Sequence, residues 1–214
     1  MRSSQGLDRP VNSRDGSPRT YNPPIDVLVL CTANQCRSPM AEVLLRRHLA
    51  EAGVDATVSS AGLHGDGAAA TAHGQAVMAA RGLDLESHRS RQLDREMLAA
   101  ADLVIAMARE HVREAAVLDP GALGRTFTLK ELVARGHAEG PRSADDSLAR
   151  WLQRVGEDRR REDLIRSGHD DAFDVADPVG RGRRDYEATA DLLDDLLAQV
   201  VGLAWPAAAR EGAA

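Results

Sequence analysis

The sequence contains few aromatic residues, few cysteines and almost no lysine. Two Trp, two Tyr and two Phe make up only 3% of its 214 residues, although 43% are hydrophobic. Its core must therefore be built mainly from Ala, Leu and Val. Two cysteines cannot form the disulfide framework of a small secreted protein, which favours a cytoplasmic one. Lys130 is the single lysine, and we attach no function to that bias.

Long apolar runs are absent as well. No stretch of 18 apolar residues occurs, so no transmembrane helix is expected. The first 20 residues lack the apolar stretch of a signal peptide, which again predicts a cytoplasmic protein. With 33 acidic against 27 basic residues, the formal net charge is −6. We expect neither nucleic acid nor a membrane as a partner, because both require a basic surface.

The length predicts one domain with tails. Residues 1–24 are polar and rich in Arg, Ser, Asp and Pro, and are predicted to be a disordered tail. The ordered domain is expected over residues 25–204, followed by a C-terminal tail over 205–214. Within the domain, residues 137–171 form a charged, insertion-like segment. Its mixed-sign run at 157–163 predicts a solvated helix face rather than a binding patch.

The rest of the domain alternates short apolar runs with amphipathic stretches. Strands are expected at 25–30, 57–60, 103–107 and 125–128, and helices at 39–52, 68–81, 94–100, 110–118 and 185–201. Ser38 is the expected N-cap of the first helix, with Pro39 at its first position. The alternation predicts an α/β fold, a three-layer α/β/α domain with a four-stranded parallel sheet.

The turn after the first strand holds the residues that suggest chemistry. Cys31 ends the strand, and Arg37 lies next to the start of the first helix. Ligands of open parallel sheets bind beyond the carboxyl ends of the strands. Loop N–H groups and the helix dipole favour an anion there, and they also favour a thiolate over a thiol. The planar guanidinium of Arg37 can hold two phosphate oxygens at once. The pattern predicts a cysteine nucleophile beside an anion cradle.

Simpler readings exist for each of these residues. A cysteine at a strand end is often a small buried hydrophobic residue. Cys36 is either a packing residue or a partner that traps an oxidised Cys31 as a disulfide, and both readings stay open. No metal is expected, because the cysteine pair lacks the second ligand pair of a zinc site.

The loop resembles that of a known family. Residues 29–42, VLCTANQCRSPMAE, resemble the signature loop of the low-molecular-weight protein-tyrosine phosphatases. Three further segments resemble the family in the same order: SSAG at 59–62, SHRSRQ at 87–92 and ADPVG at 176–180. Together the resemblance covers roughly residues 25–202.

The resemblance implies a set of roles. Cys31 would attack phosphorus and form a phosphocysteine, Arg37 would clamp the phosphoryl oxygens, and Asp177 would act as the general acid. The phosphate-binding loop would consist of Thr32, Ala33, Asn34, Gln35, Cys36 and Ser38. Ser60 and His88 would support that loop. No cofactor is implied, the partner would be a phosphorylated protein, and the enzyme is expected to be a monomer. Asp171 and Asp174 are alternative acids because they lie close by.

Several positions depart from the family pattern. Ala33 occupies a position where the family usually has Gly, which costs ~1 kcal/mol or more if its φ is positive and nothing if φ is negative. Val179 follows Asp-Pro where many members carry an aromatic residue, and Leu63 and His64 also lack the aromatic residue often found there. The site would therefore offer few aromatic side chains to pack against a phosphotyrosine ring. Gln35 is a further candidate for substrate selection.

We therefore expect a cysteine-dependent phosphomonoester hydrolase, with protein phosphotyrosine as its substrate. The alternatives on the same fold are a phosphoarginine phosphatase and an arsenate reductase, the latter generally needing a further thiol. A non-enzymatic alternative is a phosphate-binding or redox-sensing module in which Ala33 has disabled turnover.

Overall fold

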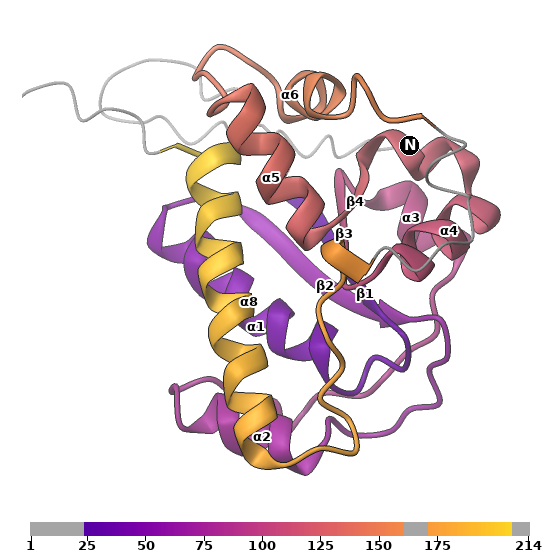
Figure 1. Ribbon diagram of the computed structural model, residues 1–214, viewed down its shortest axis with the longest axis vertical. Coiled ribbons are helices and arrows are strands. Elements are labelled where there is room, and N and C mark those ends of the chain that lie inside the picture. The colour runs from indigo at the N-terminus through magenta and orange to yellow at the C-terminus, as the bar shows by residue number, and fades with distance from the viewer. Residues whose placement is uncertain (1–23, 161–170, 207–214) are drawn as a thin grey trace, which may run out of the picture.

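A twisted parallel sheet organises the molecule (Figure 1). The computed structural model describes residues 24–160 and 171–206. The strands are β1 (Ile25–Cys31), β2 (Ala56–Gly62), β3 (Leu103–Ala106) and β4 (Thr126–Thr128), and they form one sheet in the order β2-β1-β3-β4. All of the pairings between adjacent strands are parallel. The predicted four-stranded parallel sheet is confirmed.

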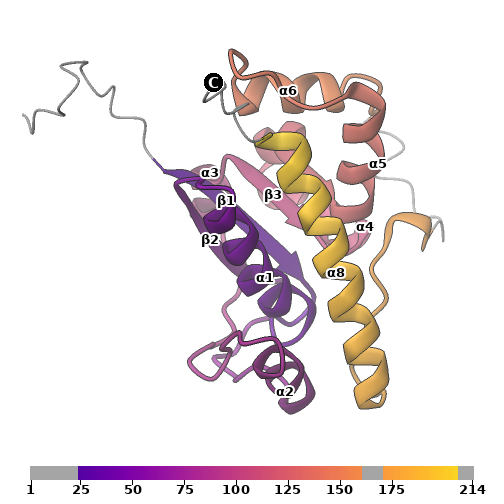
Figure 2. The same cartoon turned by 90° about the vertical axis from the view of Figure 1, so that its left-hand side faces the viewer.

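Helices cover both faces of this sheet. One hydrophobic cluster joins the sheet to α1 (Arg37–Glu51), α2 (Ala72–Ala79), α5 (Leu129–Glu139), α6 (Leu148–Val155) and α8 (Arg183–Ala204). The second cluster joins the opposite face to α3 (Arg95–Ala100), α4 (Arg109–Leu118) and the 3-10 helix η1 (Pro120–Arg125). A further 3-10 turn, η2, spans Asp171–Phe173. Figure 2 shows α1 and α8 side by side over one face of the sheet. The predicted three-layer arrangement is thus confirmed.

The central strand β1 shows why the core has two halves. Successive side chains of a strand point to opposite faces. Val27 and Val29 accordingly lie in the cluster with α1 and α8, whereas Leu28 and Leu30 lie in the cluster with α3 and α4. Cys31 continues the first set, so its thiol lies on the α1 side at the carboxyl end of the strand.

Two helix starts differ from the sequence prediction. Helix α1 begins at Arg37 rather than Pro39, and its N-cap is Cys36, which makes no side-chain cap hydrogen bond. Helix α2 begins at Ala72 rather than residue 68, because the Thr71 hydroxyl accepts a hydrogen bond from the Gly74 N–H and caps the helix there. Proline and small residues favour helix starts but do not choose among adjacent positions.

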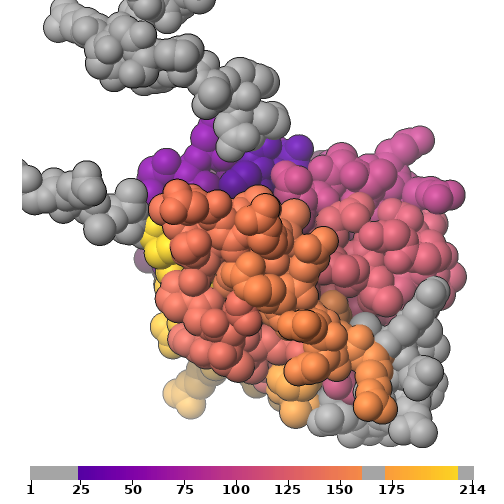
Figure 3. Space-filling model, turned by 90° about the horizontal axis from the view of Figure 1, so that it is seen from above, coloured from indigo at the N-terminus to yellow at the C-terminus, as the bar shows by residue number. Residues whose placement is uncertain are grey.

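The segment expected to interrupt the fold contains regular structure. Helix α5 continues to Glu139 and α6 follows, and Figure 3 shows these two helices covering one end of the molecule. The expected solvated helix face at 157–163 is wrong for Arg159, which follows the end of α6 and has a side chain only 4% exposed. Residues 161–163 lie outside the described residues.

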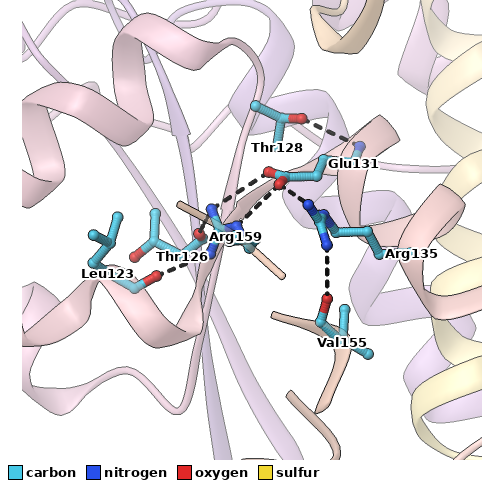
Figure 4. Close-up of polar contacts among 7 residues, drawn as sticks. All are labelled: Leu123, Thr126, Thr128, Glu131, Arg135, Val155 and Arg159. Carbon is cyan, nitrogen blue, oxygen red and sulfur yellow. Dashed lines mark hydrogen bonds and ion pairs between the residues drawn. The ribbon is translucent and has the colours of Figure 1, made fainter. Parts of the chain in front are cut away.

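Arg159 is buried because it has partners for its charge and its donors. Its guanidinium donates to the carbonyls of Leu123 and Thr126, at 3.1 and 2.8 Å, and pairs with the Glu131 carboxylate at 2.9 Å (Figure 4). It also lies over the Phe127 ring at 4.1 Å. A sequence pattern cannot show such partners, because η1, β4 and α5 bring them together only in the fold.

The predicted tails at 1–24 and 205–214 lie outside the described residues, except for positions 24, 205 and 206. Among the described helices, none has the length and apolar character needed to cross a bilayer.

Candidate active site

Five residues connect the end of β1 to the start of α1. In the described part of the chain, Asn34 is the one non-glycine residue with positive φ, at 53°. Asn tolerates this conformation better than most residues. Ala33 therefore avoids positive φ, so alanine in place of glycine introduces no backbone strain at that position.

The glycine that the loop does require lies on the neighbouring strand. A Cβ on Gly62 would lie 2.7 Å from the backbone N of Asn34 and 2.8 Å from the carbonyl oxygen of Thr32. Real Cβ contacts are essentially never this short. The loop therefore folds against the end of β2 at a distance that only glycine permits. The His64 N–H also donates to the Thr32 carbonyl at 2.9 Å, which ties the loop to the turn after β2.

The Cys31 thiol accepts a hydrogen bond from the Ser38 hydroxyl at 3.0 Å. The Asn34 amide donates in turn to the hydroxyls of Ser38 and Ser60, at 3.0 and 2.8 Å. Ser38 thus serves the thiol and is not the helix N-cap that the sequence suggested, because α1 already begins one residue before it. All four side chains are buried, and the sequence had singled out each of them.

A second ring of contacts holds Asn34 in place. His88 Nε2 donates to the Asn34 carbonyl at 2.7 Å, so this expected supporting residue does reach the loop. The Arg91 backbone N–H donates to the Asn34 side-chain oxygen at 3.0 Å, and the Ser60 hydroxyl donates to the Glu42 carboxylate. Glu42 and Arg91 lie within the segments that resemble the family, but sequence reasoning gave neither a role.

Arg37 is the first residue of α1 and is only 6% exposed. Its Nη1 donates to the Val175 carbonyl at 3.1 Å, and its Nη2 donates to the Thr32 hydroxyl at 3.1 Å and to Asp177 at 2.5 Å. Its buried Nε has no hydrogen-bond partner among the described residues. A buried donor without a partner is costly, so Arg37 retains a donor for an anion.

Of the two candidate acids whose side chains are described, Asp177 is the one that contacts Arg37. Its side chain is 41% exposed, and its second oxygen accepts the Val179 N–H at 3.1 Å. The Asp174 carboxylate instead accepts the Arg109 N–H at 2.8 Å, at the start of α4. The Asp171 side chain lies outside the described part of the structure. The geometry therefore favours Asp177 over Asp174.

The second cysteine differs chemically from the first. Cys36 is free and 4% exposed. Burial, followed by the nearby Asp177 carboxylate, raises the pKa of its thiol to about 12, although a hydrogen bond with Tyr186 acts in the opposite direction. Cys36 is therefore protonated at neutral pH and is a poor nucleophile.

Sequence reasoning also missed a buried histidine next to the loop. His111 of α4 is fully buried, and its Nε2 lies 3.1 Å from the Thr32 hydroxyl oxygen. Burial and the positive charge of Arg37 lower the pKa of His111 to about 3. No local pattern indicates this contact, because residues 32 and 111 meet only when α4 packs beside the carboxyl end of β1.

The positions near the loop that depart from the family pattern carry no Phe, Tyr or Trp side chain. Val179 is 55% exposed beside Asp177, His64 is exposed and Gln35 is half-buried. In the described ranges, no group of three or more His, Cys, Asp or Glu side chains could hold a metal ion.

Comparisons with known proteins identify a family for this sequence. The family of low molecular weight phosphotyrosine protein phosphatases matches residues 26–147. Among curated proteins, the low molecular weight protein-tyrosine-phosphatase Etp of Escherichia coli is 38% identical over 126 residues, covering 57% of this chain and 81% of Etp. The protein-arginine-phosphatase of Geobacillus stearothermophilus is 35% identical over 145 residues, covering 63% of this chain and 95% of that protein.

A solved structure extends the likeness to the whole domain. The low molecular weight protein tyrosine phosphatase from T. tengcongensis superimposes with a TM-score of 0.62 at 29% identity, covering 83% of this chain and 97% of that one. Since the family match spans more than half of the sequence and the loop geometry accompanies it, the chain belongs to the low molecular weight phosphotyrosine protein phosphatase family.

Proposed function

We propose that this chain hydrolyses phosphotyrosine in proteins, with Cys31 as the nucleophile, Arg37 as the phosphate clamp and Asp177 as the general acid. One observation carries the proposal. The Ser38 hydroxyl donates to the Cys31 sulfur at 3.0 Å, beside an arginine that has a buried, unpartnered Nε. A hydroxyl that donates to sulfur favours a thiolate over a thiol, and an arginine with a spare donor favours an anion.

The first step transfers the phosphoryl group to sulfur. The Cys31 thiolate attacks phosphorus, so that an S–P bond forms while the P–O bond to tyrosine breaks. Arg37 and the loop N–H groups hold the three remaining oxygens, over which charge spreads in the transition state. Asp177 gives its proton to the departing tyrosine oxygen, which otherwise leaves as a phenolate.

The second step restores the enzyme. Asp177, now a carboxylate, takes a proton from water while the water oxygen attacks the phosphocysteine. The P–O bond forms, the S–P bond breaks, and Cys31 leaves as a thiolate that accepts the Ser38 hydrogen bond. Inorganic phosphate is the product, and no external reductant or metal enters the balance.

Phosphoarginine is the second candidate substrate. Two observations support it. Val179 and His64 offer no aromatic side chain to pack against a tyrosine ring, and Gln35 is polar. The chain is also similar to the protein-arginine-phosphatase of Geobacillus stearothermophilus. We retain phosphotyrosine as the first candidate because the matching family is described by that activity.

Arsenate reduction is less well supported. That reaction consumes thiols in sequence, and the chain has only two cysteines. The raised pKa of Cys36 makes it a poor resolving thiolate.

Hydrolysis of four substrates tests the proposal: p-nitrophenyl phosphate and peptides bearing phosphotyrosine, phosphoserine or phosphoarginine. We expect steady turnover of the aryl phosphate, and faster hydrolysis of phosphotyrosine than of the other two peptides. Cys31→Ser should abolish turnover and still bind orthovanadate. Faster phosphoarginine hydrolysis would transfer the assignment to that substrate. A single burst of p-nitrophenol without turnover would indicate a module with disabled catalysis.

A further inference from the structure

We propose that His111 is a positioning residue for phosphoryl transfer: its neutral imidazole accepts the Thr32 hydroxyl hydrogen and so directs the Thr32 oxygen toward Arg37. This inference rests on the proposed function, because it concerns the same phosphate clamp. It adds a residue from α4, an element to which the sequence analysis gave no part in the site.

The argument starts from the hydrogens available at Thr32. Arg37 can only donate, so the Thr32 oxygen must accept the hydrogen bond from Arg37 Nη2 at 3.1 Å. The hydroxyl then has one hydrogen to give. His111 Nε2, 3.1 Å away, provides a lone pair for it if the ring proton is on Nδ1. If Nε2 carried the proton instead, the Thr32 oxygen would accept twice and its own hydrogen would lack this acceptor.

The charge of His111 agrees with this arrangement. A protonated imidazole would place a second buried cation beside Arg37, and the pKa of His111 is accordingly lowered to about 3. The ring is therefore neutral at neutral pH. His111 thus acts by accepting a hydrogen bond and not by exchanging a proton with substrate.

The polar ring has a cost that apolar packing would avoid. His111 is fully buried, and its Nδ1 has no hydrogen-bond partner in the described residues. A leucine at the same place would fill the space without an unpartnered polar atom. Within the described residues, the hydrogen bond with Thr32 is the interaction of the ring that offsets this cost.

The contact matters because Arg37 has few lasting restraints. Of its three hydrogen-bond partners among the described residues, Asp177 must leave the guanidinium if it is to protonate a leaving group, which leaves Val175 and Thr32. A guanidinium that rotates out of plane loses its two-point grip on phosphate. By accepting the Thr32 hydroxyl hydrogen, His111 keeps the Thr32 oxygen directed at Arg37, and so preserves one of these two remaining hydrogen bonds.

The experiment compares His111→Leu, which removes the acceptor, with His111→Gln, whose amide oxygen can still accept from Thr32. With an aryl phosphate, we expect His111→Leu to lower kcat about tenfold with little change in KM, since positioning acts mainly in the transition state. His111→Gln should stay within about threefold of the wild type. In a Thr32→Val background, His111→Leu should cause little further loss, because the two residues act through one contact.

Equal losses in the two variants, or a full additional loss in the Thr32→Val background, would overturn the proposal. A measurement on the wild type covers the case in which His111→Leu does not fold. Long-range ¹H–¹⁵N spectra between pH 5 and 8 should show a neutral His111 ring protonated at Nδ1, with His111→Gln identifying its signals. A proton on Nε2 would overturn the inference. Lack of turnover in the wild type would instead count against the proposed function and leave the tautomer result standing.

Discussion

Arg37 and Asp177 form an ion pair at 2.5 Å across the mouth of the loop. A phosphate held by Nε and Nη2 of Arg37 needs the same Nη2 that the Asp177 carboxylate occupies. The carboxylate and the phosphate therefore compete for one donor group. Under the proposed mechanism, substrate that displaces Asp177 from Arg37 also frees the carboxyl group to face the leaving oxygen, so this single contact would couple phosphate binding to proton transfer.

This competition predicts opposite effects of Asp177→Asn on binding and on catalysis. Removing the carboxylate charge should lower the Kd for inorganic phosphate by roughly 2–5-fold, a modest gain because the pair is partly exposed. The same variant should hydrolyse phosphotyrosine much more slowly, whereas p-nitrophenyl phosphate, whose leaving group departs readily, should be less affected. Calorimetry and steady-state kinetics measure the two effects.

Asp174→Asn is the matched control. Its side-chain oxygen can still accept the Arg109 N–H, so both the phosphate Kd and the ratio of the two substrates should stay unchanged. Weaker phosphate binding in Asp177→Asn would contradict the proposed competition. A selective loss of phosphotyrosine hydrolysis in Asp174→Asn would move the acid to that residue.

At the scale of elements, the site depends on how closely β2 approaches the loop. Gly62 pairs with Cys31 in the sheet, and the loop backbone passes over the place where its side chain would be. An interaction between two backbones has no flexible side chain that could relax, so the loop itself must shift to admit a larger residue.

We therefore expect Gly62→Ala to lower kcat/KM by about 100-fold or more, since small misplacements of a preorganised loop are costly in catalysis. Unfolding in urea should show a smaller effect, about 1–3 kcal/mol, typical of overpacking. Gly124→Ala is the control, because a Cβ there meets nothing within 4 Å. Retained activity in Gly62→Ala would mean that the loop tolerates displacement.

At the scale of the whole molecule, burial of His111 links stability to pH. Its pKa is about 3 in the fold and 6.5 in its absence. Between these values the unfolded chain binds the extra proton, so the free energy of unfolding decreases as pH falls from 6.5 toward 3. The slope for one such group is at most ~1.4 kcal/mol per pH unit.

Urea unfolding of the wild type and His111→Gln between pH 4.5 and 7.5 checks this linkage. The other titrating groups are common to both proteins, so the difference between their curves isolates His111. We expect the wild type to lose stability more steeply below pH 6.5. If the free energy of unfolding fell equally with pH in both proteins, the His111 ring would have to accept a proton within the folded state.

The Arg159 cluster also acts on the whole molecule, because it joins the end of α6 to η1, β4 and α5 (Figure 4). Burial lowers the pKa of Arg159, and Glu131 counters part of this effect. Arg159→Met would leave carbonyls and a buried carboxylate with fewer partners. We expect a loss of ~3–5 kcal/mol in the free energy of unfolding, the usual scale for breaking a buried pair.

Arg160→Met, at the exposed neighbouring position, is the control for that measurement. Surface substitutions usually change stability by less than about 0.5 kcal/mol. Similar unfolding curves for the two variants would show that the buried cluster contributes little beyond packing.

The sequence alone determined the alternation of strands and helices and the residues around Cys31. Both are local signals: apolar periodicity reports burial along one element, and Cys31 and Arg37 flank a single strand-to-helix loop within seven residues. Asn34, Ser60 and His88 were found because they lie in segments that resemble a known family. Helices α5 and α6 were missed, and the exact start of α1 was wrong by two residues, because weak patterns and neighbouring cap candidates do not decide between alternatives.

Tertiary structure alone decided which distant groups meet. Asp177 rather than Asp174 contacts Arg37, His111 reaches Thr32, and Arg159 is buried instead of solvated. Each outcome joins elements that are far apart in the chain. Partners of this kind follow from how the helices pack on the sheet, and packing depends on the shapes of many side chains together, which no single stretch of sequence contains.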